Sequence, residues 1–264
     1  MHLITTFPIK NHPRIEEYGT CLRLNLFNPY IKKITIVTDV FNVPHNLGLT
    51  NLIRDFAINF YGPTNKDVEK NEITILEHWP KYNDMFKIAN MSTQDYTIIT
   101  NGDIFLDESV RKLKRINWNS SKKFLCITRR EVSLSHDPVE NHLSLHSLRD
   151  RVKEHSPDGI CDFNSILEMH PNKFRGSADA WAFKGKISEF GEDVELGTSF
   201  CDHAIASLAK ESGYEIYNPC LDISINHLHK AIEGRHKKAR EEKRYRKGIK
   251  IPNLTPITRI KDIN

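Results

Sequence analysis

The sequence has no apolar run near the length of about 20 residues that a membrane-spanning helix requires. Its N-terminal residues lack the basic region and long apolar stretch of a signal peptide, and they are typical of a first strand. The five cysteines lie far apart and form no C-x-x-C pair, which argues against a zinc cluster and against a disulfide framework. We therefore expect a cytoplasmic protein whose cysteines are buried free thiols.

The composition is that of an ordinary globular protein, since 39% of the 264 residues are hydrophobic and 27% are charged. This length allows one large α/β domain with a substantial core. The net charge of +4 is unevenly distributed, because basic residues concentrate between Arg235 and Lys250. We expect a single domain over residues 1–230 and a basic C-terminal extension over residues 231–264.

Apolar runs of strand length alternate with helical patterns. The expected strands cover residues 3–7, 34–38, 73–76 and 96–100, and the expected helices cover residues 14–25 and 82–90. Further strands are expected at 124–128, 180–183, 214–217 and 223–227, and a further helix at 202–212. This alternation predicts an α/β fold with a mostly parallel sheet and helices on both faces. Residues 131–175 are polar and rich in His and Pro, so we expect an irregular insertion there.

The segment Tyr96–Asp107 carries the strongest functional signal. An apolar run stops at Asn101-Gly102-Asp103 and resumes at Ile104. Asp103 offers hard oxygen ligands of the kind that Mg²⁺ or Mn²⁺ bridging a diphosphate requires. Gly102 permits an uncommon backbone conformation and a close approach to a bound group. An ordinary Asn-Gly hairpin turn is the alternative interpretation of this segment by itself.

Two later segments add candidate residues. Asp202 stands at the start of a helical pattern, where a carboxylate either caps the helix or serves a site. His227 and His229 are two positions apart on an expected strand, so both would face one side and could approach one metal. A hydrogen-bonded surface pair is the alternative for these histidines.

Taken in order, these three segments resemble the nucleotide-sugar-dependent glycosyltransferases of the GT-A fold. The resemblance is strongest to small glycosyltransferase domains of bacteria and large DNA viruses. Residues 101–103 stand where the family has its metal-binding Asp-x-Asp motif. Asp202 stands at the Glu-Asp pair that begins a helix in many members. His227 or His229 stands at the C-terminal histidine that binds the metal.

The resemblance implies a GT-A fold over roughly residues 1–230, with a Rossmann-like, mixed and mostly parallel sheet flanked by helices. It also implies transfer of a sugar from a UDP- or GDP-sugar to a saccharide or glycoconjugate acceptor, as in polysaccharide biosynthesis. Mn²⁺ or Mg²⁺ would be held by Asp103 and a histidine, and Asp202 would be the base. Asn101 replaces the family's first carboxylate and Cys201 replaces its Glu, so Asp103 and Asp202 carry these roles without a second carboxylate.

Other polar residues stand where strand ends or a helix start could reach the donor. The expected nucleotide or donor contacts are Thr5, Thr6, Asp39, Tyr82, Asn101, Gly102, Arg129 and Asp179. Solvated loop polarity is the alternative for the first four of these. Trp181 is either a platform for a sugar face or, in the commoner role of tryptophan, a core residue.

Two other functions compete with this interpretation. A sugar nucleotidyltransferase would want a glycine-rich, basic loop after the first strand, and residues 6–13 contain no glycine. A nucleic-acid-binding protein acting through the basic extension would show a recognisable motif or stacking aromatics, and Tyr245 is the only aromatic residue among the basic ones. We therefore do not expect a nucleic-acid partner. A solvated extension and a peripheral contact with an anionic membrane surface both stay open.

Overall fold

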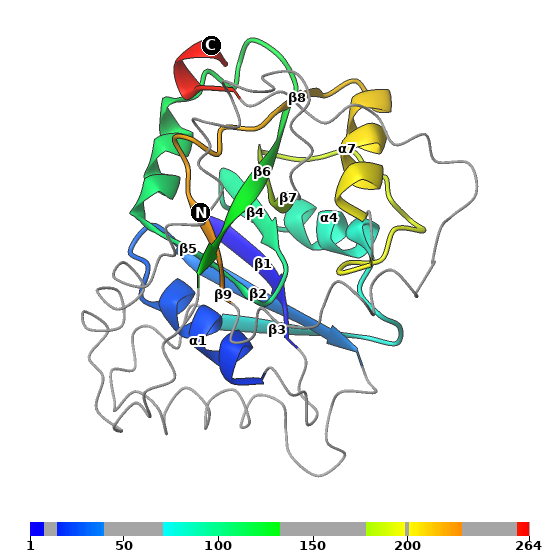
Figure 1. The fold of residues 1–264 in the computed structure, drawn as a ribbon. Helices are drawn as coiled ribbons and strands as arrows, with labels where there is room; N and C mark the ends of the chain where they lie inside the picture. The colour runs from blue at the N-terminus through cyan, green and yellow to red at the C-terminus, as the bar shows by residue number, and fades with distance from the viewer. Residues whose placement is uncertain (8–14, 40–70, 133–177, 199–200, 229–257, 264) are drawn as a thin grey trace, which may run out of the picture.

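The computed structural model describes residues 1–7, 15–39, 71–132, 178–198, 201–228 and 258–263 (Figure 1). Its strands are β1 (His2–Thr6), β2 (Lys33–Asp39), β3 (Asn71–Leu76), β4 (Tyr96–Thr100), β5 (Ile104–Leu106), β6 (Lys123–Val132), β7 (Ala178–Lys184), β8 (Glu215–Tyr217) and β9 (Ile225–Leu228). Its helices are α1 (Ile15–Leu26), α4 (Tyr82–Asn90) and α7 (Cys201–Glu211), with short 3-10 helices η2 (Glu108–Arg115) and η3 (Ile260–Asp262).

The strands form one nine-stranded sheet in the order β3-β2-β1-β4-β7-β6-β9-β5, with β8 paired to β6. The pairs β1–β2, β2–β3 and β1–β4 are parallel. Strand β7 is antiparallel to both β4 and β6. Strand β6 is parallel to β8 and β9, and β5 is antiparallel to β9. The expected α/β fold with a mixed, mostly parallel sheet is therefore confirmed.

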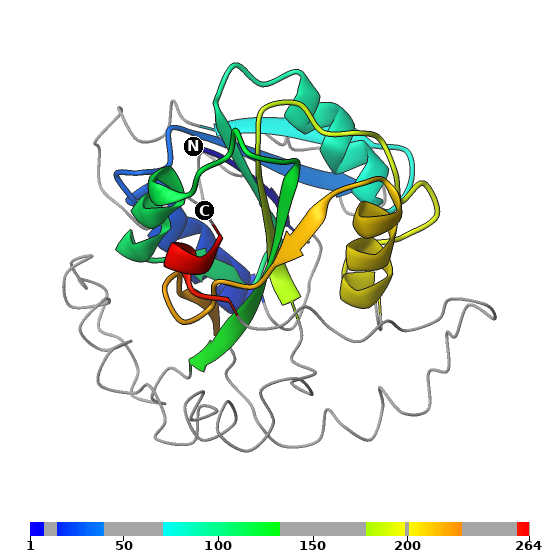
Figure 2. The same ribbon diagram turned by 90° about the horizontal axis from the view of Figure 1, so that it is seen from above.

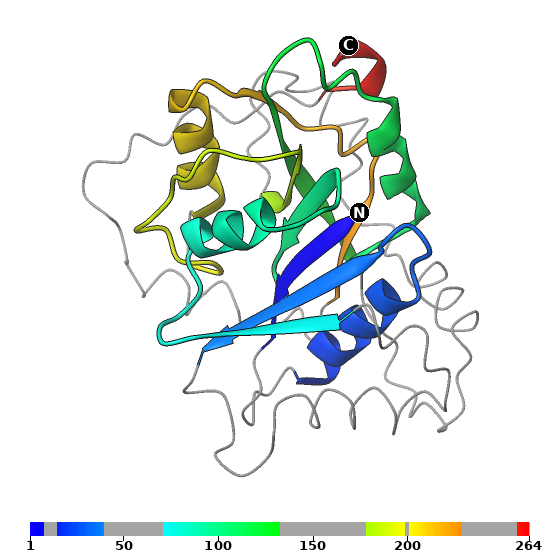
Figure 3. The ribbon, with the colours of Figure 1, turned by 180° about the vertical axis from the view of Figure 1, so that it is seen from behind.

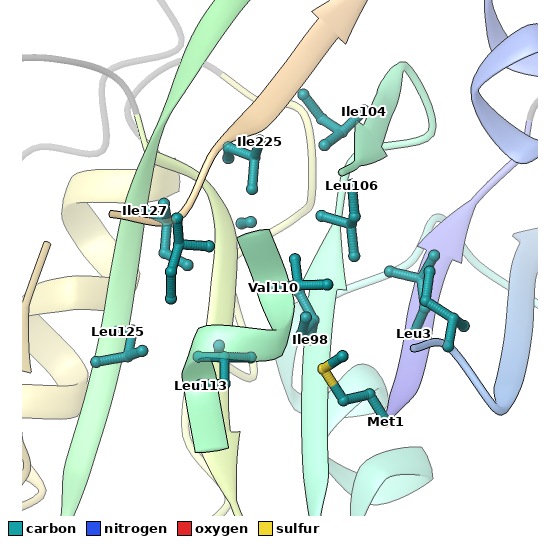
Figure 4. Packing of buried hydrophobic residues seen from close by; sticks show 14 of the residues in the cluster. Met1, Leu3, Ile98, Ile104, Leu106, Val110, Leu113, Leu125, Ile127 and Ile225 are labelled. Atoms are coloured by element: carbon teal, nitrogen blue, oxygen red, sulfur yellow. The ribbon is translucent and has the colours of Figure 1, made fainter. Parts of the chain in front are cut away.

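Helix α1 lies on one side of the sheet, and α4 and α7 lie on the other (Figure 2). On the α1 side, Leu3, Ile98 and Leu125 of the sheet pack with Val110 and Leu113 of η2 (Figure 4). Side chains alternate between the two faces of a strand, so a strand covered on both sides buries nearly every side chain. In β1, β2 and β4 these buried side chains are leucine, isoleucine and valine together with threonine and histidine.

The second face of the sheet carries an aromatic core beneath α4 and α7. Figure 3 shows the ribbons of these two helices from behind. The Tyr82 ring meets the Trp181 ring edge-on, with centroids 4.8 Å apart. Phe86 lies 4.6 Å from Phe190, centroid to centroid. Buried aromatic pairs at such distances add about 0.5–1.5 kcal/mol each beyond the burial of their area. The core on this side therefore holds the first turns of α4 and α7 against the sheet.

Strand β5 is held on two sides. One side pairs with β9, and on the other Asn25 of α1 takes the place of a neighbouring strand. Asn25 Nδ2 donates to the Ile104 carbonyl at 2.9 Å, and the Leu106 N–H donates to Asn25 Oδ1 at 2.9 Å. Asn28 Nδ2 adds a bond of 2.9 Å to the Leu106 carbonyl. These buried amides fix the strand that directly follows Asp103.

The last described residues of the expected basic extension return to the main core. Ile260 and Ile263 are buried in the same cluster as α1 and η2. The Ile260 N–H donates to Asp222 Oδ2 at 2.9 Å, and the Thr258 N–H donates to the Asn218 carbonyl at 3.0 Å. Residues 258–263 are thus packed on the domain, while the basic run 235–250 lies outside the described residues. None of the helices described is long and apolar enough to cross a membrane.

Candidate active site

The strand order brings the candidate residues to one edge of the sheet. Thr5 of β1 is in register with Thr100 of β4, which is in turn opposite Ala180 of β7. The end of β1, the end of β4 and the start of β7 therefore meet at the carboxyl edge of the parallel strands. Open α/β sheets bind their ligands at this edge. Thr6, Asn101 and Asp179 are brought together there.

Asp103 and His227 form the closest pair of candidate metal ligands. His227 Nε2 lies 3.0 Å from Asp103 Oδ2, although 124 positions separate the two residues. The pairing of β5 with β9 accounts for this, because Ile104 is opposite His227 and the Leu228 N–H donates to the Asp103 carbonyl at 3.0 Å. The side chains of His227 and Asp103 are 3% and 11% exposed. The pair is therefore held rigidly by backbone hydrogen bonds.

This pair fits part of a divalent metal site. Two ligands on adjacent corners of an octahedral ion, with bonds of about 2.1 Å, are about 3.0 Å apart. The pair is hydrogen-bonded to itself at about this spacing, and its carboxylate and imidazole groups are donors that suit Mn²⁺. Among the described residues no cluster of three or more His, Cys, Asp or Glu side chains occurs, and His229 lies outside them. A metal here would complete its shell with water and substrate phosphates, as Mg²⁺ commonly does.

Gly102 has a different role from the one expected. A Cβ at this position would lie 2.1 Å from the Thr6 carbonyl oxygen and 2.5 Å from Cδ1 of Tyr18. The residue is not among the glycines with positive φ. The expected uncommon backbone conformation is therefore wrong. Glycine is required because the turn after β4 passes directly over the end of β1, where a side chain has no room.

Asp179 is the centre of a second polar cluster. Arg129 Nη1 donates to Asp179 Oδ1 at 2.9 Å, and Asn101 Nδ2 donates to the same oxygen at 3.3 Å. The resemblance expects the first metal-binding carboxylate of the motif at position 101. Asn101 instead donates a hydrogen bond to Asp179. Arg129 is partly exposed while Asp179 is nearly buried, so the guanidinium lies toward the outer side of the pair. Charged hydrogen bonds of this kind are stronger than neutral ones and fix the geometry of both groups.

Asn218 supports this cluster, and only its place in an Asn-Pro turn marks it in the sequence. Strand β6 has an irregularity in its pairing with β7 between Ile127 and Thr128. The Thr128 N–H donates to Asn218 Oδ1 at 3.1 Å, and Asn218 Nδ2 donates to Thr128 Oγ1 at 2.9 Å. The extra residue is Asp179 of β7, because Ile127 is opposite Ala180 and Thr128 is opposite Ala178. The buried Asn218 amide binds Thr128 on the β6 side of this bulge, directly before Arg129.

Asp202 is tied to the backbone at the start of β7. Its Oδ2 accepts the Ala178 N–H at 3.1 Å, and its Oδ1 accepts the His203 N–H at 2.9 Å. Ala178 directly precedes Asp179 in β7. The hydrogen bond to Ala178 therefore brings Asp202, in the first turn of α7, close to the Asp179 cluster. Asp202 therefore ties the first turn of α7 to the start of β7, and it lies beside the second polar cluster. Its expected role as the base stays a prediction.

The remaining expected donor contacts divide into two groups. Thr5 Oγ1 donates to the Asn101 carbonyl at 3.2 Å and accepts from Thr100 Oγ1 at 3.2 Å, which ties it to the turn. Tyr82 is fully buried against Trp181, and its hydroxyl lies 3.6 Å from Cys201 Sγ. Burial raises the pKa of Cys201 to about 11, so its thiol stays protonated at neutral pH. Tyr82 and Trp181 are thus core residues and do not line an accessible surface. Asp39 ends β2, and its side chain lies outside the described residues.

No protein-family model matches the sequence, and a search of curated proteins finds no match. Solved structures with a likeness to the fold include an inositol-1-phosphate CTP transferase from T. maritima, with a TM-score of 0.44 and 8% identity over 90% of this chain and 93% of that one. The galactosyltransferase LgtC, in complex with donor and acceptor sugar analogs, has a TM-score of 0.37 and 8% identity over 70% of this chain. TarS from S. aureus, in complex with UDP-GlcNAc, has a TM-score of 0.32 and 13% identity over 53% of this chain.

The chain spans 58% of the LgtC chain and 36% of the TarS chain. All three TM-scores lie below 0.5 and all three identities below 25%.

Proposed function

We propose that this protein is a metal-dependent glycosyltransferase of the GT-A type, which transfers a sugar from a nucleoside diphosphate sugar to a saccharide or glycoconjugate acceptor. The observation that carries the proposal is the pair of Asp103 and His227. The fold joins these two donors across 124 positions and buries them between β5 and β9, next to the carboxyl edge of β1 and β4. A carboxylate and an imidazole with ligand spacing at that edge suit a diphosphate-bridging cation.

The chemistry required is stabilisation of a departing nucleoside diphosphate. Asp103 and His227 would hold Mn²⁺ or Mg²⁺, which when bound neutralises charge on the diphosphate as a Lewis acid. Arg129 supplies a cationic group close by, and Asp179 holds that guanidinium in place at 2.9 Å. Asp179 and Asn101 offer hydrogen-bonding groups suited to the hydroxyls of a donor sugar, and Thr5 and Thr6 line the adjoining end of β1.

Asp202 is our candidate for the base that takes the proton of the acceptor hydroxyl. It stands beside Asp179 through the Ala178 N–H. Each carboxylate oxygen has two lone-pair directions, so the two backbone hydrogen bonds leave capacity to accept one from a substrate hydroxyl. Contact of the basic run 235–250 with an anionic membrane surface stays a prediction. The use of a UDP- or a GDP-sugar as the donor is also a prediction.

A panel of UDP- and GDP-sugars tests the proposal through Mn²⁺-dependent binding and release of the nucleoside diphosphate. Asp103→Ala is expected to abolish the metal-dependent part. Asp95→Ala is the matched control, because Asp95 is exposed and directly precedes β4, whereas Asp103 follows the other end of that strand. If no nucleotide sugar binds the unaltered protein with any divalent metal, the proposal fails. Release of pyrophosphate from a nucleoside triphosphate and a sugar phosphate would instead identify a sugar nucleotidyltransferase.

A further inference from the structure

We propose that Trp79, together with His78 and Asp84, forms a binding site for a pyranose saccharide at the rim of the active site. This inference rests on the proposed function, since it assigns the saccharide acceptor to a place on the molecule. Trp79 is 40% exposed. Among the described residues, Trp79 and Met91 are the large hydrophobic side chains that are exposed. The other tryptophans differ, because Trp181 is fully buried and Trp118 packs against Tyr96.

The Trp79 ring is fixed in its exposed position. Its Nε1–H donates to the Leu196 carbonyl at 2.9 Å. The two segments that carry these residues are joined by backbone hydrogen bonds, from Leu196 N–H to the Pro80 carbonyl at 3.0 Å and from Tyr82 N–H to the Val194 carbonyl at 2.9 Å. An aromatic side chain that is already ordered loses little conformational entropy when a ligand covers it. The exposure of Trp79 is therefore built into the frame that holds α4.

Polar side chains accompany Trp79 on the segment that leads into α4. His78, the residue before Trp79, is half exposed, and its Nε2 lies 2.9 Å from Oδ2 of the partly buried Asp84. The same oxygen accepts the Lys81 N–H at 2.9 Å, which holds the carboxylate at the first turn of α4. A carboxylate retains further acceptor positions, and an imidazole can donate or accept. An apolar ring face beside fixed hydrogen-bonding groups suits a sugar ring, which has an apolar C–H face and hydroxyls at its edge.

The position agrees with an acceptor site. Trp79 lies between the end of β3 and the start of α4, and β3 ends at the same carboxyl edge as β1 and β2. Leu196, its hydrogen-bond partner, precedes the first turn of α7, which carries Asp202. Tyr82 links the starts of α4 and α7 through its hydroxyl and Cys201 Sγ, 3.6 Å apart. A saccharide on Trp79 would therefore lie beside the segment that leads into α7 and Asp202.

Fluorine NMR of protein labelled with 5-fluorotryptophan tests this site without any need for turnover. The chain has three tryptophans, and the Trp79 resonance is the one that Trp79→Phe removes. A panel of methyl glucosides, galactosides, mannosides and N-acetylglucosaminides is the probe. At least one glycoside is expected to shift the Trp79 resonance in a saturable way and to leave the other two unmoved. No shift with any glycoside would overturn the saccharide site.

Kinetics provide the second readout. Trp79→Ala is expected to raise the KM for acceptor about tenfold and to leave Mn²⁺-dependent hydrolysis of the nucleotide sugar unchanged. Met91→Ala, the matched control at the other exposed hydrophobic residue, should alter neither. An equal loss of hydrolysis and transfer in Trp79→Ala would overturn the acceptor role. Broadening of the Trp79 resonance with protein concentration alone would assign the ring to a contact between copies and also overturn it.

The two proposals fail in distinguishable ways. Glycoside binding at Trp79 without binding of any nucleotide sugar would keep the saccharide site and overturn the transferase. Hydrolysis of a nucleotide sugar without any response at Trp79 would keep the transferase and overturn the saccharide site.

Discussion

Asn25 on α1 completes the backbone hydrogen bonding of Leu106 in β5, at 2.9 Å, as a neighbouring strand would. The amide also binds the Ile104 carbonyl at 2.9 Å, so one side chain satisfies a donor and an acceptor of the same strand. Because β5 begins directly after Asp103 and pairs with the strand of His227, a buried amide on a distant helix holds the candidate metal ligands in register.

Asn25→Ala is expected to lower the free energy of unfolding by about 2–4 kcal/mol, since it leaves two buried backbone groups without partners. Asn25→Asp should be intermediate, because a carboxylate can accept from Leu106 but cannot donate to Ile104. Urea unfolding followed by circular dichroism measures both. Equal stability of Asn25→Ala and the unaltered protein would contradict this role of the side chain.

His227→Ala is expected to weaken Mn²⁺ binding at least about tenfold, because it removes one of the two ligands that the fold places at 3.0 Å. Isothermal titration calorimetry with MnCl₂ measures the dissociation constant directly. His78→Ala is the control, since His78 is exposed and remote from β9. Unchanged affinity in His227→Ala would remove this histidine from the metal site.

Gly102→Ala is expected to destabilise the protein by about 3 kcal/mol or more, because the new Cβ would lie 2.1 Å from a backbone oxygen that cannot move alone. Gly185→Ala is the comparison. Its φ of +73° strains an alanine by about 1–2 kcal/mol, but nothing lies within 4 Å of the new Cβ. Thermal unfolding of both variants separates the clash from the strain. A smaller effect at Gly102 than at Gly185 would refute the close approach of the turn to β1.

Asp202→Asn distinguishes two roles of Asp202, as the base in transfer and as a group that only holds the backbone at the start of α7. The variant keeps one acceptor oxygen for the Ala178 or His203 N–H, so we expect a loss of about 1 kcal/mol in stability. Donor binding should persist while transfer to acceptor falls by a factor of about 100 or more. Calorimetric binding of the nucleotide sugar and rates of transfer are measured on the same preparation. Full transfer activity in the folded variant would leave Asp202 with its structural role alone.

His2 makes stability depend on pH. Burial lowers the pKa of His2 from 6.5 to about 4, and its Nε2 lies 2.7 Å from Thr35 Oγ1. The unfolded chain therefore takes up a proton as the pH falls through 6.5, while the folded protein does so only near pH 4. Between these values stability decreases with falling pH by up to about 1.4 kcal/mol per pH unit from this group.

Urea unfolding at pH 7 and at pH 4.5 measures the effect. His2→Gln should lose less stability between the two pH values than the unaltered protein does, because glutamine has no proton to take up. Other titrating groups are common to both proteins and cancel in the comparison. The same pH dependence in both would show that His2 titrates normally in the folded state.

Most strands and all three α-helices of the described residues could be predicted from the sequence, because local patterning determines them. The β-branched residues of β1, β2 and β4 marked these strands. The three-residue strand β5 and the two 3-10 helices were not expected, because they are short and depend on tertiary contacts. The same patterning marked Asp103 and Asp202 as carboxylates at element boundaries. It did not determine that Trp181 is buried and Trp79 exposed, since only tertiary packing decides which ring is covered.

What the sequence determined by itself is the order of strands and helices and the residue types at their ends. Tertiary structure decided which of those residues meet. Asp103 reaches His227 because β5 and β9 pair. Arg129 reaches Asp179 because β6 pairs with β7, in which Asp179 is the extra residue of a bulge. Gly102 is required because the turn crosses β1. Local propensity acts over a few residues, whereas these contacts arise from strand pairing and steric exclusion between segments far apart in the chain.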